Sequence, residues 1–334
     1  MRELSIETME MHTGGEPVRI ILSGYPELAG KTLLDKRRDA RAHHDRLRAL
    51  LMREPRGHKE MYGALLVPPD HPEADLAVLF LHNEGYSTMC GHAVLALGRY
   101  AVDHGLVTPV GSQALVQIQC PCGLVAVRVD VENGKGGAAR FTSVPSFAAA
   151  LDQEIASPAW GRVGLDIGYG GAFYAILPAS RLGLDLASTP LPQLIQAAAE
   201  VTTLTAAQLE IHHPDEPDLG FLYGTILTDG GDGLSGTVSR NLCIFAGDQA
   251  DRSPTGSGVT ARMALLQARG QVRLGEDACF ESIVGSRFTA RIDGETQLAG
   301  KAAVTVEVEG KAHYSGRATF WIEEDDPFQE GFLL

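Results

Sequence analysis

Met89-Cys-Gly-His92 and the apolar run Ala93–Val107 organise the rest of this sequence. An apolar strand is predicted at Leu76–Leu81, and the polar turn His82–Thr88 separates it from the cysteine. The cysteine therefore stands immediately before a helix, which Gly105 ends. Backbone N–H groups at a helix N-terminus lack partners and carry the positive end of the helix dipole, which favours a thiolate. This position is typical of a reactive cysteine.

The same pattern returns in the second half of the chain, where Asp251–Gly258 leads into a second apolar helix, Val259–Arg269. Aligning the two patterns pairs glycine with glycine at both ends of the helices and places Cys90 opposite Thr255. A duplication of about half the chain implies two similar halves, each presenting a helix N-terminus. If the halves face each other, one ligand lies between Cys90 and Thr255.

Composition narrows the class of protein. The chain has 334 residues, enough for two domains that each have a core, and its hydrophobic fraction of 44% is ordinary for a globular protein. A formal net charge of −14 argues against nucleic-acid or anionic-membrane partners. We find neither the apolar core of a signal peptide nor a run of roughly 20 apolar residues that could span a membrane. The five cysteines are odd in number and sparse, so we expect a protein of the reducing cytoplasm.

The remaining pattern is mostly β, with one outer and one central helix in each half. We expect the outer helices at Thr32–Arg53 and around Pro190–Thr203. A helix that is apolar nearly all round, such as Ala93–Val102, has to be wrapped by a sheet. Strands are predicted on either side of these helices at 5–11, 18–22, 64–68, 76–81, 114–119, 123–130, 139–143, 172–177, 221–228, 237–245, 288–292, 301–308 and 311–322.

The sequence therefore predicts an α+β chain of two pseudo-symmetric, β-rich domains, each curled round a central helix. We place the first domain at residues 1–147 together with the C-terminal tail 318–334. The second domain is expected at residues 148–317.

Cys90 is the strongest candidate for a catalytic residue. A small buried hydrophobe is the ordinary role of an unpaired cysteine, but the position before a helix favours reactivity. Thr255 also has an ordinary alternative, because threonine is a favoured N-cap. The repeat favours a functional role for Thr255, since it occupies the cysteine's place in the other half.

Backbone N–H groups at the starts of both helices, from Gly91, His92, Gly256 and Ser257, form a ready site for a carboxylate. His92 serves either as a ligand contact or only as a backbone donor whose side chain packs locally. Asp251, in the loop before the second helix, is either an acceptor for a ligand amine or a plain loop aspartate.

The other cysteines and the histidines give no sign of a metal site. Cys120-Pro-Cys122 is too tight for a usual zinc pair, and the histidines show no metal-ligand spacing with one another. Cys243 and Cys279 lie in apolar strand contexts and are expected in the core. No nucleotide-binding or nucleophile-elbow motif occurs, so we expect neither a metal nor an organic cofactor.

Over essentially its full length, the chain resembles the proline racemase family, within the diaminopimelate-epimerase-like fold. The matching stretches are Met11-His-Thr-Gly-Gly-Glu-Pro17, Gly57-His-Lys-Glu-Met-Tyr-Gly63, Asn83-Glu-Gly-Tyr86, Met89-Cys-Gly-His92, Asp166, Gly170-Gly-Ala-Phe-Tyr174, Asp251-Arg-Ser-Pro-Thr-Gly-Ser-Gly258, Glu281-Ser-Ile-Val-Gly-Ser286 and Asp326-Pro-Phe328. No one of these stretches is specific by itself, but together they are.

Racemases and epimerases of this family use two cysteines, one on each face of the substrate Cα. The resemblance implies that Cys90 abstracts a proton, whereas Thr255 stands where the second cysteine would be. A Cys/Thr pair is similar to that of the trans-3-hydroxy-L-proline dehydratase branch, which implies an imino-acid substrate and a homodimer. The resemblance also implies five substrate contacts, namely Gly91, His92, Asp251, Gly256 and Ser257.

The chemistry of the pair points the same way. Racemisation needs two groups that exchange protons near neutral pH, and a thiol with a reference pKa of about 8.5 can be tuned to do so. A threonine hydroxyl is far too weak an acid. One base suffices for β-elimination, in which Cys90 takes the Cα proton and the 3-hydroxyl leaves as water. The resulting enamine tautomerises to Δ1-pyrroline-2-carboxylate, and capture of the carboxylate at the helix N-termini stabilises the developing charge.

Three functions are therefore weighed. The first is a hydro-lyase that acts on trans-3-hydroxy-L-proline. The second is a hydroxyproline or proline epimerase or racemase, in which another donor bypasses Thr255. The third is a non-catalytic imino-acid binding protein, which Cys90 argues against because binding alone needs no thiol. The sequence leaves Thr255, His92 and a water molecule open as the proton donor to the leaving hydroxyl.

Overall fold

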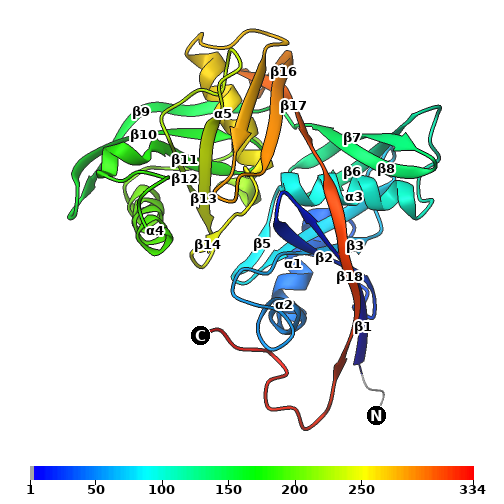
Figure 1. Cartoon of the computed structure of the whole chain (residues 1–334). Coiled ribbons are helices and arrows are strands. Elements are labelled where there is room, and N and C mark those ends of the chain that lie inside the picture. The colour runs from blue at the N-terminus through cyan, green and yellow to red at the C-terminus, as the bar shows by residue number, and fades with distance from the viewer. Residues whose placement is uncertain (1–3) are drawn as a thin grey trace. The chain divides into compact units, whose positions relative to one another are not determined.

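The computed structural model describes residues 4–334, which form two compact units (Figure 1). Unit 1 holds the chain up to Thr88, together with His92–Ala139 and Lys311–Leu334. Unit 2 holds Met89–Gly91 and Arg140–Gly310. These bounds differ by a few residues from the predicted domains, 1–147 with 318–334 and 148–317. The reason is that the chain passes between the units within β8 (Lys135–Thr142) and again just after β17 (Lys301–Gly310).

Unit 1 is built mainly from strands. Its elements are β1 (Leu4–Thr13), β2 (Glu16–Ser23), α1 (Leu33–His43), α2 (Asp45–Met52), β3 (Gly63–Val67), β4 (Leu76–His82), β5 (Gly85–Ser87), most of α3 (Gly91–Asp103), β6 (Gln113–Cys120), β7 (Gly123–Glu132), part of β8 and β18 (Ala312–Ile322). Strand β2 pairs antiparallel with β1 and parallel with β3. Strand β4 pairs antiparallel with β3 and β5 and parallel with β6, which in turn pairs antiparallel with β7.

Unit 2 repeats this order of pairings. Its elements are β9 (Phe147–Ser157), β10 (Gly161–Tyr169), β11 (Phe173–Pro178), α4 (Leu191–Gln208), β12 (Leu222–Thr228), β13 (Ser239–Phe245), β14 (Gln249–Ala250), α5 (Gly256–Ala268), β15 (Asp277–Glu281), β16 (Arg287–Leu298) and β17, with short 3₁₀ turns at Ala179–Leu182 and Pro217–Leu219. Strand β11 pairs antiparallel with β10 and parallel with β12. Strand β13 pairs antiparallel with β12 and β14 and parallel with β15, which pairs antiparallel with β16. The predicted repeat is thus confirmed as a repeat of topology.

The two central helices match in length as well as in place. Helices α3 and α5 each have 13 residues. Both are followed by a glycine with a φ of 68°, at Gly105 and Gly270, a backbone that favours glycine. Residues Ala93–Leu97 of α3 are fully buried, and α5 packs against β9, β10, β16 and β17 within unit 2 (Figure 1). The predicted α+β class, with a central helix in each β-rich half, is confirmed.

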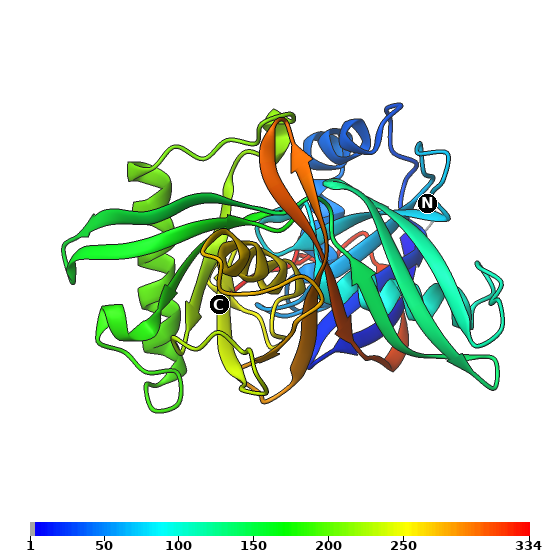
Figure 2. The same ribbon diagram turned by 90° about the horizontal axis from the view of Figure 1, so that it is seen from above.

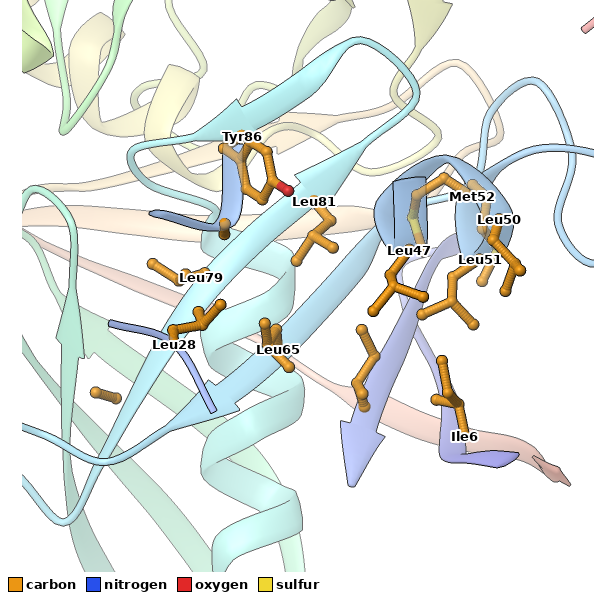
Figure 3. Packing of buried hydrophobic residues seen from close by; sticks show 14 of the residues in the cluster. Ile6, Leu28, Leu47, Leu50, Leu51, Met52, Leu65, Leu79, Leu81 and Tyr86 are labelled. Atoms are coloured by element: carbon orange, nitrogen blue, oxygen red, sulfur yellow. The ribbon is translucent and has the colours of Figure 1, made fainter. Parts of the chain in front are cut away.

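The prediction of one outer helix at Thr32–Arg53 was wrong. Helix α1 ends and α2 begins at His44, which has a non-helical backbone (φ −127°, ψ 9°). The start is as expected, because Thr32 and Asp35 form a reciprocal capping box. The break turns α2 so that its apolar side chains join those of β3 and β4 in one hydrophobic core (Figure 3). The labelled members of this core are Ile6, Leu28, Leu47, Leu50, Leu51, Met52, Leu65, Leu79, Leu81 and Tyr86.

The β9–β10 hairpin was not predicted from the sequence. It is the pair of long green strands that Figure 2 shows in unit 2. The segment Ala148–Leu151 lacks the alternation of a strand, and the pairing shifts register between Leu165 and Gly168. Cys279 on β15 is half-buried, so its predicted place in the core was wrong, whereas Cys243 is fully buried as expected. Within residues 4–334, none of the helices combines the length and the apolar character needed to cross a membrane.

Candidate active site

Cys90 is a buried thiol that directly precedes the first residue of α3. Its short segment, Met89–Gly91, packs with unit 2, whereas the rest of α3 belongs to unit 1. Cys90 as a whole residue is 6% exposed. The predicted location at a helix N-terminus is therefore found, and it puts the thiol in the same unit as the start of α5.

Glycines join the starts of the two central helices. A Cβ atom on Gly91 would lie 2.4 Å from the Cα of Gly256, and a Cβ on Gly256 would lie 2.6 Å from the Cα of Gly91. No real side chain tolerates such distances, so only two glycines allow the backbones to touch here. This contact, inside unit 2, brings together the residues that precede the two glycines, Cys90 and Thr255.

Thr255 adopts a left-handed backbone (φ 66°, ψ 88°), which is rare for a β-branched residue. It stands at the N-cap of α5, yet its side chain makes no capping hydrogen bond. Its Oγ1 instead donates to Oδ2 of Asp251 at 2.8 Å. Such a backbone costs about 1–3 kcal/mol and persists where its surroundings hold it. The ordinary alternative, a hydroxyl that only caps the helix, is not the arrangement that this threonine adopts.

Asp251 is buried in the loop between β14 and α5, with 4% of its surface exposed. Its second oxygen, Oδ1, accepts a hydrogen bond from the backbone N–H of Ser253 at 2.7 Å. Burial is the largest influence on this carboxyl group and raises its pKa, although the hydrogen bonds from Thr255 and Ser253 and the charge of Arg252 oppose it. A carboxylate has about four acceptor positions, so the hydrogen bonds from Thr255 and from the side chain and backbone of Ser253 leave about one position for a ligand amine.

Ser257, in the first turn of α5, is paired with a residue that the sequence did not single out. Its Oγ lies 2.7 Å from the hydroxyl of Tyr174, a buried side chain on β11. Burial raises the pKa of Tyr174 well above its usual value, and Cys90 is among the charges that raise it further. The thiol is therefore within electrostatic reach of this tyrosine. Tyr174 closes the stretch Gly170–Tyr174, which was the signal that could have pointed to it.

The side chain of His92 is engaged within unit 1. Its Nε2 lies 3.2 Å from the carbonyl oxygen of Pro17, and its ring meets Tyr62 edge-on at a centroid distance of 4.9 Å. Its own carbonyl accepts a hydrogen bond from Oγ1 of Thr13 at 2.8 Å. These contacts fit local packing of the imidazole, which is one of the two alternatives for the His92 side chain.

The arrangement in unit 2 offers distinct chemical tools. A buried thiol at a helix start can act as a base, because the nearby backbone N–H groups favour its anionic form. The hydroxyl of Thr255, tied to a buried carboxyl group, can pass or accept a proton but cannot act as a thiol does. Backbone N–H groups of Gly91, Gly256 and Ser257 lie at the starts of helices, where they can bind an anion.

Comparison with known proteins gives consistent results. A human trans-3-hydroxy-L-proline dehydratase is 54% identical to this chain. The match covers 98% of this chain and 94% of the human protein. The trans-3-hydroxy-L-proline dehydratase of Colwellia psychrerythraea is 44% identical over 99% of this chain and 93% of its own length. Among solved structures, a hydroxyproline epimerase from Agrobacterium vitis with bound trans-4-hydroxy-L-proline superimposes with a TM-score of 0.94 at 28% identity, over 100% of this chain and 96% of the other.

The match to a family model covers nearly all of the chain. The model described as proline racemase matches residues 8–333, which include both helix starts, all of β18 and the second half of β1. By this match, and by relatives that are more than 40% identical over almost the whole chain, the protein belongs to the proline racemase family.

Proposed function

We propose that this chain is a hydro-lyase that dehydrates trans-3-hydroxy-L-proline to Δ1-pyrroline-2-carboxylate. The observation that carries the proposal is the unequal pair at the helix starts, with a thiol at Cys90 and a hydroxyl at Thr255. A threonine hydroxyl cannot exchange protons near neutral pH as a thiol does, so the site holds one base rather than two. One base fits elimination better than racemisation. The names of the human and Colwellia relatives support the same substrate.

In the proposed reaction, Cys90 removes the proton from Cα and the 3-hydroxyl group leaves from the neighbouring carbon. The product is an enamine, which becomes Δ1-pyrroline-2-carboxylate when a proton is added at C3. The substrate carboxylate binds the backbone N–H groups at the helix starts. These groups, which we assign to Gly91, His92, Gly256 and Ser257, also stabilise the negative charge that develops beside the carboxylate.

Asp251 is the proposed contact for the substrate amine. Its buried carboxyl group lies in the same loop as Thr255 and keeps an acceptor position beyond its hydrogen bonds with Thr255 and Ser253. An ammonium bound there neutralises a charge that burial makes costly. The family relationship supports an imino-acid substrate, and a homodimer and a cytoplasmic location remain predictions.

The deciding experiment is incubation of the purified protein in deuterated water with three substrates. If the protein is a dehydratase, trans-3-hydroxy-L-proline gives a pyrroline product, whereas trans-4-hydroxy-L-proline and L-proline give none. Cys90→Ser is expected to abolish the product, because a serine hydroxyl is a far weaker base. Inversion at Cα of either of the other two substrates, without loss of water, would show an epimerase instead. That second function is favoured by the structural match to the epimerase of Agrobacterium vitis.

A further inference from the structure

The loop before α5 contains two groups that can deliver a proton to the departing 3-hydroxyl group. We propose that Asp251 relays a proton from the substrate amine through Thr255 to the departing 3-hydroxyl group. The inference rests on the proposed dehydratase function and assigns the proton donor that the sequence left open. It makes Asp251 part of the elimination step as well as of binding.

Geometry is the first support for this relay. Thr255 Oγ1 and Asp251 Oδ2 are 2.8 Å apart, a distance at which a proton can pass between them. The other carboxyl oxygen is fixed by the N–H of Ser253 at 2.7 Å, so the carboxyl group is held in one orientation. Thr255 has a left-handed backbone, and its hydroxyl donates to the carboxyl group and makes no hydrogen bond to the helix cap. A threonine that served only the helix would need neither feature.

The direction of the hydrogen bond decides what Thr255 can offer a ligand. When Asp251 is a carboxylate, the threonine hydroxyl donates to it and offers a ligand only lone pairs. When Asp251 has taken up a proton, its own O–H can donate to the threonine oxygen, and the threonine O–H is released toward the ligand. A departing hydroxide needs a donor, so elimination requires the second state.

Burial makes that second state accessible. Asp251 is 4% exposed, and burial raises the pKa of its carboxyl group, which favours the protonated form that the relay uses. The positive charge of Arg252 opposes this effect and lowers the pKa. On β13, the carbonyl of Cys243 accepts the backbone N–H of Asp251 at 3.0 Å, and that residue's thiol is buried. The guanidinium of Arg262 on α5 is bound instead to Asn241, at 2.8 Å.

The proton count closes without any other reactant. The Cα–H electrons form the Cα=C3 double bond while Cys90 thiolate takes the proton, and the C3–O bond breaks with its electrons on oxygen. The oxygen receives the hydroxyl proton of Thr255 and leaves as water. Asp251 then reprotonates Thr255. The proton on Asp251 comes from the substrate ammonium. Cys90 then gives its proton to C3 of the enamine or to solvent. The enzyme ends as thiolate and carboxylate, the state in which it began.

The test separates proton delivery to the leaving group from proton removal at Cα. Asp251→Asn, Thr255→Val and Thr255→Ser are assayed in deuterated water with trans-3-hydroxy-L-proline, measuring pyrroline formation and Cα deuterium exchange. Each is assayed also with trans-3-fluoro-L-proline, because fluoride leaves as an anion and needs no proton. Loss of general acid catalysis predicts that kcat for water loss falls about 100-fold or more in Asp251→Asn and Thr255→Val. In Thr255→Val, Cα exchange and fluoride release are expected to fall much less than water loss, and Thr255→Ser is expected to retain most of its water loss. Asp251→Asn also removes the proposed amine contact, so its two leaving groups are compared at saturating substrate, where water loss is expected to fall more than fluoride release.

Three results would overturn the relay. Equal losses with both leaving groups would show a structural or binding role, as would a loss confined to KM. Unchanged water loss in Thr255→Val would exclude Thr255 as the donor. If one variant fails to fold, as judged by circular dichroism, the other still decides the matter. Absence of pyrroline from the unmodified protein would instead refute the proposed function, so the two failures are distinguishable.

Discussion

At the start of α3 a cysteine precedes a glycine, and at the start of α5 a threonine precedes a glycine. Both helices have 13 residues and the glycine backbones touch. The side chains are not equivalent, because Thr255 is tied to a buried carboxyl group and Cys90 is a thiol. The two halves thus share the helix length and the glycine contact, whereas the reactive groups, a thiol and a hydroxyl, differ. Two helix starts with the same backbone arrangement can therefore supply one base instead of the two that racemisation needs.

Removing the thiol at the start of α3 is expected to have the largest effect on activity. Cys90→Ser is expected to lower kcat about 1,000-fold or more, because the proton-abstracting base is lost. The measurement is the rate of pyrroline formation. Cys279→Ser, on β15, is the matched control, since that half-buried thiol lies outside the proposed site. Near-normal turnover by Cys90→Ser would transfer the role of base to another residue.

Adding one carbon to the glycine contact tests the shared frame. Gly256→Ala would place a methyl group 2.6 Å from the Cα of Gly91, so one helix start has to move. We expect overpacking to cost about 1–3 kcal/mol in unfolding free energy and misplacement of the site to lower kcat about 100-fold. Denaturant titration and steady-state kinetics measure the two effects. The control is Gly316→Ala on β18, where a Cβ meets nothing within 4 Å.

The first turn of α5 contains Ser257, whose hydroxyl is paired with that of Tyr174, and this pair is a second feature in which the two helix starts can be compared. Tyr174→Phe removes the hydroxyl that lies 2.7 Å from Ser257 Oγ. One buried hydrogen bond lost corresponds to about 1–2 kcal/mol, or about tenfold in kcat/KM if Ser257 helps to bind the substrate. Tyr100→Phe on α3 is the control. An effect on stability alone would make the pair structural.

The smallest expected effect is on stability as a function of pH. Burial raises the pKa of Asp251, so the folded protein binds more protons than the unfolded chain above the unfolded value of about 3.9. The stability of the unmodified protein relative to Asp251→Asn should therefore fall as pH rises from about 4 through the folded pKa, by at most about 1.4 kcal/mol per pH unit. Thermal unfolding of both proteins across this window measures the difference. A rise with pH would contradict the assigned direction.

Local signals explain what could be predicted from the sequence. The apolar runs and the glycines that end them are properties of neighbouring residues, and they located both central helices and their starts. Asp251 could be singled out because it precedes Thr255 in the same loop. Each helix start could be predicted from one helix and its preceding turn, and the pairing of Cys90 with Thr255 needed only the alignment of these two short stretches.

Distant or irregular features could not be predicted in the same way. The Tyr174–Ser257 contact joins β11 to α5, and no periodicity connects them. The break at His44 follows from how α2 packs on β3 and β4, since the helix propensity of the segment is continuous. The β9–β10 hairpin is set by pairing with register shifts, which override the weak local preference of Ala148–Leu151.

The left-handed backbone at position 255 also limits what evolution can try there. A replacement has to accept a positive φ, fit a buried loop and reach Asp251 without a long side chain. Glycine and asparagine satisfy the backbone, while serine and cysteine have the small polar group. Few substitutions are therefore accessible, and each corresponds to a different capacity to move a proton. A single constrained backbone position can in this way confine a whole lineage to a small set of reactions.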